Sequence, residues 1–346
     1  MRVFRDGTGV SALLCLGFLA FGCRFYPLGA PGPGERGLAV RSPRELPPSV
    51  AAYFTPRYPS WGLRLDLKER KSAYELYEIS FWTFSEVYQE LQRITGVYYR
   101  TLKLRPGERA PLLVDMPILG GAKDDYLACR VFGRWAADAG LSSFYLHQDA
   151  DILTGERDAA ELDRLMRDCI IAYRKTVDLF AAERSEVDPL RLGSIGISLG
   201  AIRNVVLIAV EPRLRANLLC LGGGDLPAIL VASQERMVLR YLERRKRLDG
   251  LDPEGVAAEF RWEFLAEPLQ FARFVPPENA LLFLGCFDDK VPYRTGLVLR
   301  EALGRPALHV VPLGHYTGLL AAPYAARKGF AWMARRFEEI RADSKP

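Results

Sequence analysis

The sequence predicts an α/β fold in which a mostly parallel central sheet is flanked by helices on both faces, with a helical lid inserted late in the chain. Strand-like and helix-like segments alternate along most of the sequence, which is typical of parallel sheets with crossover helices. The strand-like runs are almost continuously apolar, which indicates strands buried on both faces. One of these strands leads directly into the turn Gly196-x-Ser198-x-Gly200 and then into a helix-compatible run.

The composition is that of an ordinary globular protein. The chain has 346 residues, of which 49% are hydrophobic and 26% charged, with a net charge of +5. Charges of both signs are mixed through most of the chain, so we predict no nucleic-acid-binding surface. The most basic run, residues 236–247, carries apolar residues at helical spacing. It predicts a solvated helix face, with contact to a membrane surface as the alternative.

The N-terminus has the pattern of an export signal. Arg2 and Arg5 precede an almost wholly apolar run at 10–22, which is too short to span a bilayer comfortably. Small residues at 20 and 22 suit a cleavage site before Cys23, so residues 1–22 are predicted to be a signal peptide. The site also resembles a bacterial lipobox, although Ala20 stands where leucine is usual. The expectation is an exported protein of the bacterial cell envelope, either periplasmic or anchored through lipid on Cys23, with an unprocessed anchor as the alternative.

Residues 23–59 are rich in Pro and Gly and have little periodicity, so they predict a tether to a folded domain at 60–346. Beyond residue 23 the cysteines are 129, 169, 220 and 286, which are far apart and lack metal-ligand spacing. No zinc site is therefore predicted. A Cys220–Cys286 bridge stays open, because the two strands next to these residues are expected to be neighbours.

The elements of the domain follow from apolar runs, periodicity and turn residues. Strands are predicted at 74–82, 97–104, 110–117, 143–147, 216–221, 279–285 and 307–312. A further strand is predicted to end at Ile197, just before the turn at Ser198. Helices are predicted at 122–139, where Gly140 ends the pattern, and at 159–182, 201–210, 293–303 and 318–340. Residues 225–274 are mostly helical and polar-faced and interrupt the alternation, so they predict an inserted lid.

The strand, turn and helix around Ser198 match the context of a nucleophile elbow. Such a turn strains the backbone of the serine, and side chains two positions to either side would collide, which explains Gly196 and Gly200. The serine hydroxyl then stands at the carboxyl end of a strand, where ligands bind in parallel sheets. A simple Gly/Ser turn between strand and helix is the alternative.

A serine nucleophile needs a base and an acid that holds the tautomer of that base. The chain has three histidines. His147 ends a strand before the elbow and His309 lies inside the last strand, so only His315, on a loop before the final helix, is placed to reach Ser198. For the acid, Asp288 and Asp289 follow the strand at 279–285, and Asp225 follows the glycines 222–224. Each could instead be a loop or helix-capping residue.

From about residue 74 to the final helix, the chain resembles the α/β-hydrolase superfamily. The matching motifs are Gly196-Ile197-Ser198-Leu199-Gly200, Gly285-x-x-Asp288-x-x-Val291-Pro292 and Gly314-His315. The resemblance implies a triad of Ser198, Asp288 and His315, with Asp289 as a mere neighbour of the acid. It also implies an oxyanion hole from the backbone N–H of Leu199 and of either Ile118 or Leu119. The histidine-glycine oxyanion motif of the family is absent, and residues 117–121 take its place.

The activity implied by this resemblance is a serine hydrolase, most simply a carboxylesterase that forms an acyl-enzyme on a small-molecule ester without metal or organic cofactor. A thioesterase, peptidase or acyltransferase on the same fold is one alternative. A catalytically silent binding protein of the envelope is another, because fold analogy alone does not decide function.

Overall fold

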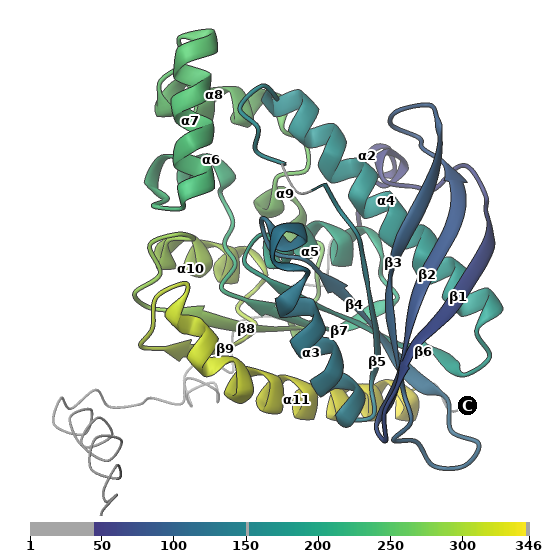
Figure 1. The fold of residues 1–346 in the computed structure, drawn as a ribbon. Coiled ribbons are helices and arrows are strands. Elements are labelled where there is room, and N and C mark those ends of the chain that lie inside the picture. Colours follow the sequence, from purple (N-terminus) through teal and green to yellow (C-terminus); the bar gives the residue numbers. More distant parts are fainter. Residues whose placement is uncertain (1–44, 150–151, 344–346) are drawn as a thin grey trace, which may run out of the picture. The chain divides into compact units, whose positions relative to one another are not determined.

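The computed structural model describes residues 45–149 and 152–343. Within them, nine strands form one sheet in the order β1-β2-β3-β5-β4-β6-β7-β8-β9 (Figure 1). The six strands from β5 to β9 in this order are parallel, whereas β1, β2 and β3 form an antiparallel end that continues antiparallel onto β5. The prediction of a mostly parallel sheet is therefore confirmed. The strands are β1 (Ser60–Arg70), β2 (Tyr74–Phe84), β3 (Leu91–Thr101), β4 (Ala110–Met116), β5 (Ser142–Leu146), β6 (Val187–Ile197), β7 (Leu214–Cys220), β8 (Ala280–Gly285) and β9 (Ala307–Val311).

Helices cover both faces of the parallel part of the sheet, which explains its continuous apolar strands. Every residue of β4 is buried, with Leu112 and Val114 in one core and Leu113 in the other, because successive side chains of a strand point to opposite faces. The helices α4 (Ala159–Glu183), α5 (Leu199–Val210) and α10 (Tyr293–Ala302) contribute to the first core, and α3 (Leu127–Asp138) and α11 (Ala322–Asp343) to the second.

Strand β1 was not predicted. It is the outer strand of the antiparallel end, and most of its residues are exposed or only half-buried. The run Leu63-Arg64-Leu65-Asp66-Leu67-Lys68 alternates apolar and polar residues, which indicates a strand with one solvent-exposed face. A search for continuous apolar runs overlooks such a strand.

The folded domain also begins earlier than the predicted boundary at residue 59. Helix α2 (Pro48–Tyr53) precedes the sheet, and Phe54 at its end is fully buried in the main core. The Tyr53 hydroxyl donates to Asp163 of α4 at 2.5 Å, and Arg174 donates to the carbonyl of Phe54 at 2.7 Å. The last part of the predicted tether is therefore part of the domain, because one aromatic anchor and two long-range hydrogen bonds fix it there.

The segment 225–274 is helical, as predicted, and lies between β7 and β8 in the chain. It contains α6 (Leu226–Ala232), α7 (Arg236–Asp249), α8 (Pro253–Glu263) and α9 (Pro268–Ala272), of which α6, α7 and α8 lie together at one end of the domain (Figure 1). The basic run falls on α7, where Val238, Tyr241 and Leu242 are buried while most arginines are exposed, so it forms an amphipathic helix with one exposed face. No helix among the described residues is long and apolar enough to cross a membrane.

The bridge between Cys220 and Cys286 is not formed, and both residues carry thiols. Cys220 of β7 lies opposite Phe283 in the parallel register of β8. Cys286 is thus three residues further along, about 10 Å at 3.3 Å per residue. A disulfide needs its two Cα atoms within about 7 Å.

Candidate active site

Ser198 occupies a sharp turn between β6 and α5, with φ +56° and ψ −124°. Its N–H donates to the carbonyl of Cys220 on β7 at 2.9 Å, which holds the turn against the sheet. A Cβ on Gly196 would lie 2.5 Å from the Gly200 carbonyl oxygen, and a Cβ on Gly200 would overlap the Met116 carbonyl oxygen of β4. Both glycines are thus required by close backbone packing around the serine.

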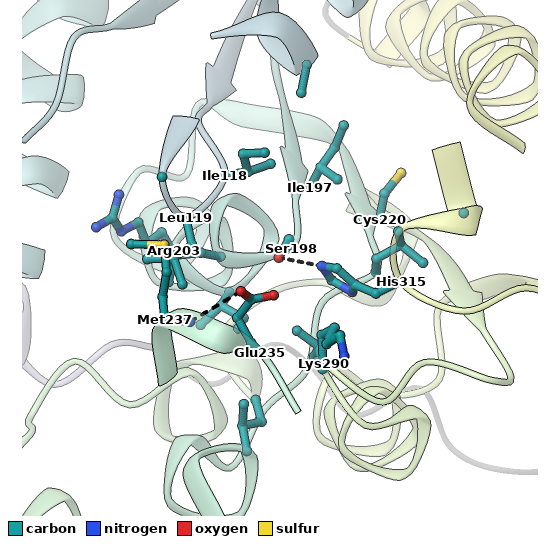
Figure 2. A pocket seen from close by; sticks show the side chains of 18 of the residues that line it. Ile118, Leu119, Ile197, Ser198, Arg203, Cys220, Glu235, Met237, Lys290 and His315 are labelled. Carbon is teal, nitrogen blue, oxygen red and sulfur yellow. Dashed lines mark hydrogen bonds between the residues drawn. The ribbon is translucent and has the colours of Figure 1, made fainter. Parts of the chain in front are cut away.

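The side chains of Ser198, His315 and Asp288 form one continuous hydrogen-bonded chain. His315 Nε2 lies 2.9 Å from Ser198 Oγ (Figure 2), and His315 Nδ1 lies 2.7 Å from Asp288 Oδ2. The Asp288 side chain is only 2% exposed and that of His315 10%, so bulk water competes weakly for these bonds. An ionised Asp288 only accepts, so Nδ1 donates to it and Nε2 is left to accept the serine hydroxyl.

Of the three aspartates considered for this position, only Asp288 contacts His315. Its second oxygen, Oδ1, accepts from the backbone N–H groups of Lys290 and Val291 at 2.9 Å each, which fixes the carboxylate. The Asp289 side chain is 59% exposed and pairs with Lys290 at 3.3 Å. Asp225 caps α6 by accepting from the N–H of Ala228 at 3.1 Å.

The other two histidines lie elsewhere. His147 Nδ1 is 3.0 Å from the hydroxyl of Thr95, on the antiparallel end of the sheet. His309 of β9 stacks on Phe283, with ring centroids 4.6 Å apart, and its Nδ1 is 3.1 Å from the hydroxyl of Tyr324. Burial lowers the pKa of His309 below 6.5, and the charge of Lys328 lowers it further, which favours the neutral ring.

The two segments expected to supply the oxyanion N–H groups, at Leu199 and in the loop after β4, both pack close to Ser198. Leu199 is the first residue of α5, where an N–H has no acceptor within the helix. The loop after β4 packs against the backbone at Gly200. A Cβ on Gly200 would lie 3.1 Å from the carbonyl oxygen of Pro117, which begins that loop. Ile118 and Leu119 of this loop line the same cavity as Ser198 (Figure 2).

Ser198 and His315 open into a cavity of about 680 Å³. Its walls are largely apolar and come from several parts of the fold, namely α3 (Val131, Phe132), α4 (Leu162, Met166), the inserted helices (Leu230, Val238, Phe260) and the segment before α11 (Leu319). Three charged side chains, those of Arg203, Glu235 and Lys290, also line it.

Three further residues that line the cavity, Glu235, Tyr316 and Cys220, were not predicted from the sequence. Glu235 accepts a hydrogen bond from the hydroxyl of Tyr316, so the start of α7 is joined to the residue next to His315. Burial and the Glu235 carboxylate raise the pKa of Tyr316 to about 12. Cys220 lines the cavity too, and burial raises the pKa of its thiol to about 12, so it stays protonated and is a poor nucleophile. None of these residues belongs to a motif.

No group of three or more His, Cys, Asp or Glu side chains suited to a metal ion occurs in residues 45–149 and 152–343.

A scan against protein-family models and a search of curated proteins found no match. Solved structures do match. An acetyl xylan esterase from Paenibacillus sp. R4 is 16% identical with a TM-score of 0.58, over 82% of this chain and 91% of that one. Acetyl xylan esterase 1 from Thermoanaerobacterium sp. JW/SL YS485 is 17% identical with a TM-score of 0.56, over 81% and 91%. The alpha/beta hydrolase GrgF from Penicillium sp. sh18 is 14% identical with a TM-score of 0.52, over 76% and 99%. The chain therefore has the α/β-hydrolase fold.

Proposed function

We propose that this chain is a serine hydrolase that cleaves small-molecule esters through an acyl-enzyme on Ser198. The observation that carries the proposal is the unbroken chain of hydrogen bonds Ser198–His315–Asp288, which opens into an apolar cavity. A nucleophile within 3 Å of a base that is itself held by a buried acid is the arrangement that acyl transfer requires.

The geometry supports the following steps. Ser198 Oγ attacks the acyl carbonyl carbon while His315 Nε2 takes the hydroxyl proton, and the carbonyl electron pair becomes an oxyanion. The N–H of Leu199 and one N–H of the loop after β4 stabilise that charge. The intermediate collapses, and the departing alkoxide receives the proton from Nε2. Water then attacks the acyl-enzyme while His315 takes its proton, the bond from Oγ to the acyl carbon breaks, the acyl group leaves as a carboxylic acid, and Nε2 returns the proton to Ser198 Oγ.

The cavity favours esters with an apolar acyl group. Its apolar walls hold few partners for the hydroxyls of a sugar, and a polar group buried without a partner costs free energy. Two of the similar structures carry the name acetyl xylan esterase, but such a substrate fits these walls poorly. Each buried CH₂ contributes about 0.8 kcal/mol, or roughly fourfold in binding.

We expect kcat/KM for a 4-nitrophenyl hexanoate to exceed that for the acetate by up to about 200-fold, given four added CH₂ groups at roughly fourfold each. Steady-state kinetics on an ester series, with acetylated xylan alongside, measures this. A preference for acetyl esters would contradict the apolar assignment. Thioesters and amides in the same series distinguish an esterase from a thioesterase or a peptidase, and an added alcohol acceptor reveals an acyltransferase.

The test of the activity itself is labelling by a fluorophosphonate, which reacts only with an activated serine. We expect one adduct per chain, located on the peptide that contains Ser198. A chain that resists the probe and hydrolyses none of the esters would be a binding protein instead.

We also propose that the chain is exported and carries lipid on Cys23. The support is the basic start, the apolar run at 10–22 and the small residues before Cys23. These positions lie outside the residues that the structure describes. Two acyl chains on one cysteine would hold a soluble domain at a membrane. Mass spectrometry of the native N-terminus should find a diacylglycerol-modified Cys23, and an unmodified Cys23 or an intact Met1 would rule it out.

A further inference from the structure

The oxyanion loop after β4 is held by a side chain that belongs to no motif. Gln148, just after β5, donates from Nε2 to the carbonyl oxygen of Ile118 at 3.0 Å. We infer that Gln148 and Arg203 are positioning residues that turn the N–H of Leu119 toward the oxyanion. The inference rests on the proposed serine hydrolase function and resolves the choice between Ile118 and Leu119.

The carbonyl of Ile118 is fixed by two donors. Besides Gln148 Nε2, the N–H of Gly121 donates to it at 3.1 Å. In a trans peptide, the C=O of one residue and the N–H of the next point in opposite directions. Neither Gln148 nor Gly121 lines the cavity, so the Ile118 carbonyl that they bind faces away from it and the N–H of Leu119 is directed toward it.

The orientation of the Gln148 amide is set by Arg203. This arginine is only 5% exposed, lies on α5 and donates from Nη1 to Gln148 Oε1. A guanidinium has no acceptor, so it can bind only the oxygen of the amide, and the Nε2 group must then face the Ile118 carbonyl. Among the described residues, the Nε of Arg203 has no hydrogen-bond partner, whereas its Nη1 binds Gln148 Oε1. Its hydrogen bond to Gln148 Oε1 therefore fixes which end of the amide faces the Ile118 carbonyl.

The main chain of Gln148 is held as well. The hydroxyl of Tyr126 accepts from the Gln148 N–H at 2.9 Å and donates to its carbonyl at 3.2 Å. Helix α5 carries Ser198 at its start, Leu199 as its first residue and Arg203 within its second turn. One rigid helix therefore carries the nucleophile and the first oxyanion donor, and through Arg203 and Gln148 it also fixes the loop that supplies the second donor.

The test is Gln148→Glu. A carboxylate still accepts from Arg203, so the buried contact survives and the melting temperature should not fall. The carboxylate cannot donate to the Ile118 carbonyl and repels its oxygen. The loop after β4 should therefore rotate, which displaces the N–H of Leu119. Loss of one oxyanion donor costs about 10²–10³ in kcat, and a displaced donor should cost about 10- to 100-fold, with KM nearly unchanged.

A trifluoromethyl ketone with an apolar chain provides the second measurement. Ser198 adds to its carbonyl carbon, the proton passes to His315, and the carbonyl oxygen becomes an oxyanion. Its Ki should rise in Gln148→Glu by the same factor as kcat/KM falls, while the Ki of an alkanol of equal length, which carries no oxyanion, stays constant. The matched control is Gln89→Glu, which removes another amide that donates to a backbone carbonyl, that of Glu86, at 2.8 Å on a distant hairpin. This variant should leave kcat/KM, the Ki of the ketone and the Ki of the alkanol at their wild-type values.

The outcomes separate the two proposals. Wild-type protein that neither hydrolyses esters nor reacts with the ketone would overturn both the hydrolase and the role of Gln148. An active wild type with an unimpaired Gln148→Glu variant would overturn only the role of Gln148. The same holds if the ketone and the alkanol weaken equally, or if the melting temperature falls along with kcat, because the glutamine would then serve only structure.

Discussion

Ser198→Ala is expected to lower kcat by about 10⁴- to 10⁶-fold while the fold stays intact. Alanine keeps the Cβ, so the strained backbone at φ +56° is unaltered. The hydroxyl that is lost bonds to Nε2 of His315, and no other partner supplies a nucleophile at that point. Steady-state kinetics with an activated ester, together with thermal unfolding, measures both parts of the prediction.

The matched control is Ser194→Ala, on the same strand. The Ser194 hydroxyl is fully buried and donates to Asn217 Oδ1 at 2.6 Å. Its removal leaves that oxygen without this donor, which should cost about 1–3 kcal/mol of stability but little rate. Ser198→Ala should thus lower kcat but not the melting temperature. Ser194→Ala should lower the melting temperature but leave kcat almost unchanged. A Ser198→Ala protein that hydrolyses esters at the wild-type rate would place the nucleophile elsewhere.

Asp288→Asn is expected to lower kcat by up to about 10⁴-fold at an unchanged melting temperature. The asparagine oxygen can still accept from the N–H groups of Lys290 and Val291, so the loop keeps its local bonds. Its amide nitrogen then faces Nδ1 of His315 as a donor. The imidazole must accept there and carry its proton on Nε2, where it can no longer take the proton of Ser198.

Two further variants test the assignment of the acid. Asp289→Asn alters a largely exposed side chain and should leave both rate and stability near wild type. Asp225→Asn alters a helix cap, a role that asparagine also performs, so its effect should be small. Loss of activity in Asp289→Asn instead would mean that the loop register is shifted by one residue, and loss in Asp225→Asn would move the acid to the preceding strand.

The parts of the fold that were predictable are those buried on both faces. The predicted strand at 110–117 compares with β4 (Ala110–Met116), and the predicted helix at 159–182 with α4 (Ala159–Glu183). Complete burial demands an apolar run or a clear helical period, and both are visible in one sequence. Strand β1 and helix α2 escaped prediction because one is half-exposed and the other is six residues long and fixed mainly by distant contacts.

The sequence by itself determined the elbow and the order of serine, aspartate and histidine along the chain. The elbow is a local feature. The close approach of backbone around Ser198 leaves no room for a side chain at positions 196 and 200, so the two glycines predict it. The order of the elements likewise placed His315 on the same edge of the sheet as Ser198, because the carboxyl ends of parallel strands meet there.

Only the tertiary structure decided which neighbouring side chains meet. Asp288 and Asp289 are chemically identical neighbours, and the contact of Asp288 with His315 spans 27 positions of the sequence. Gln148 meets Arg203 across 55 positions, with no motif at either residue. Such contacts depend on how β5, α5 and the loop after β4 pack in three dimensions. A single sequence carries no local signal for that packing, so these contacts appear only once the chain is folded.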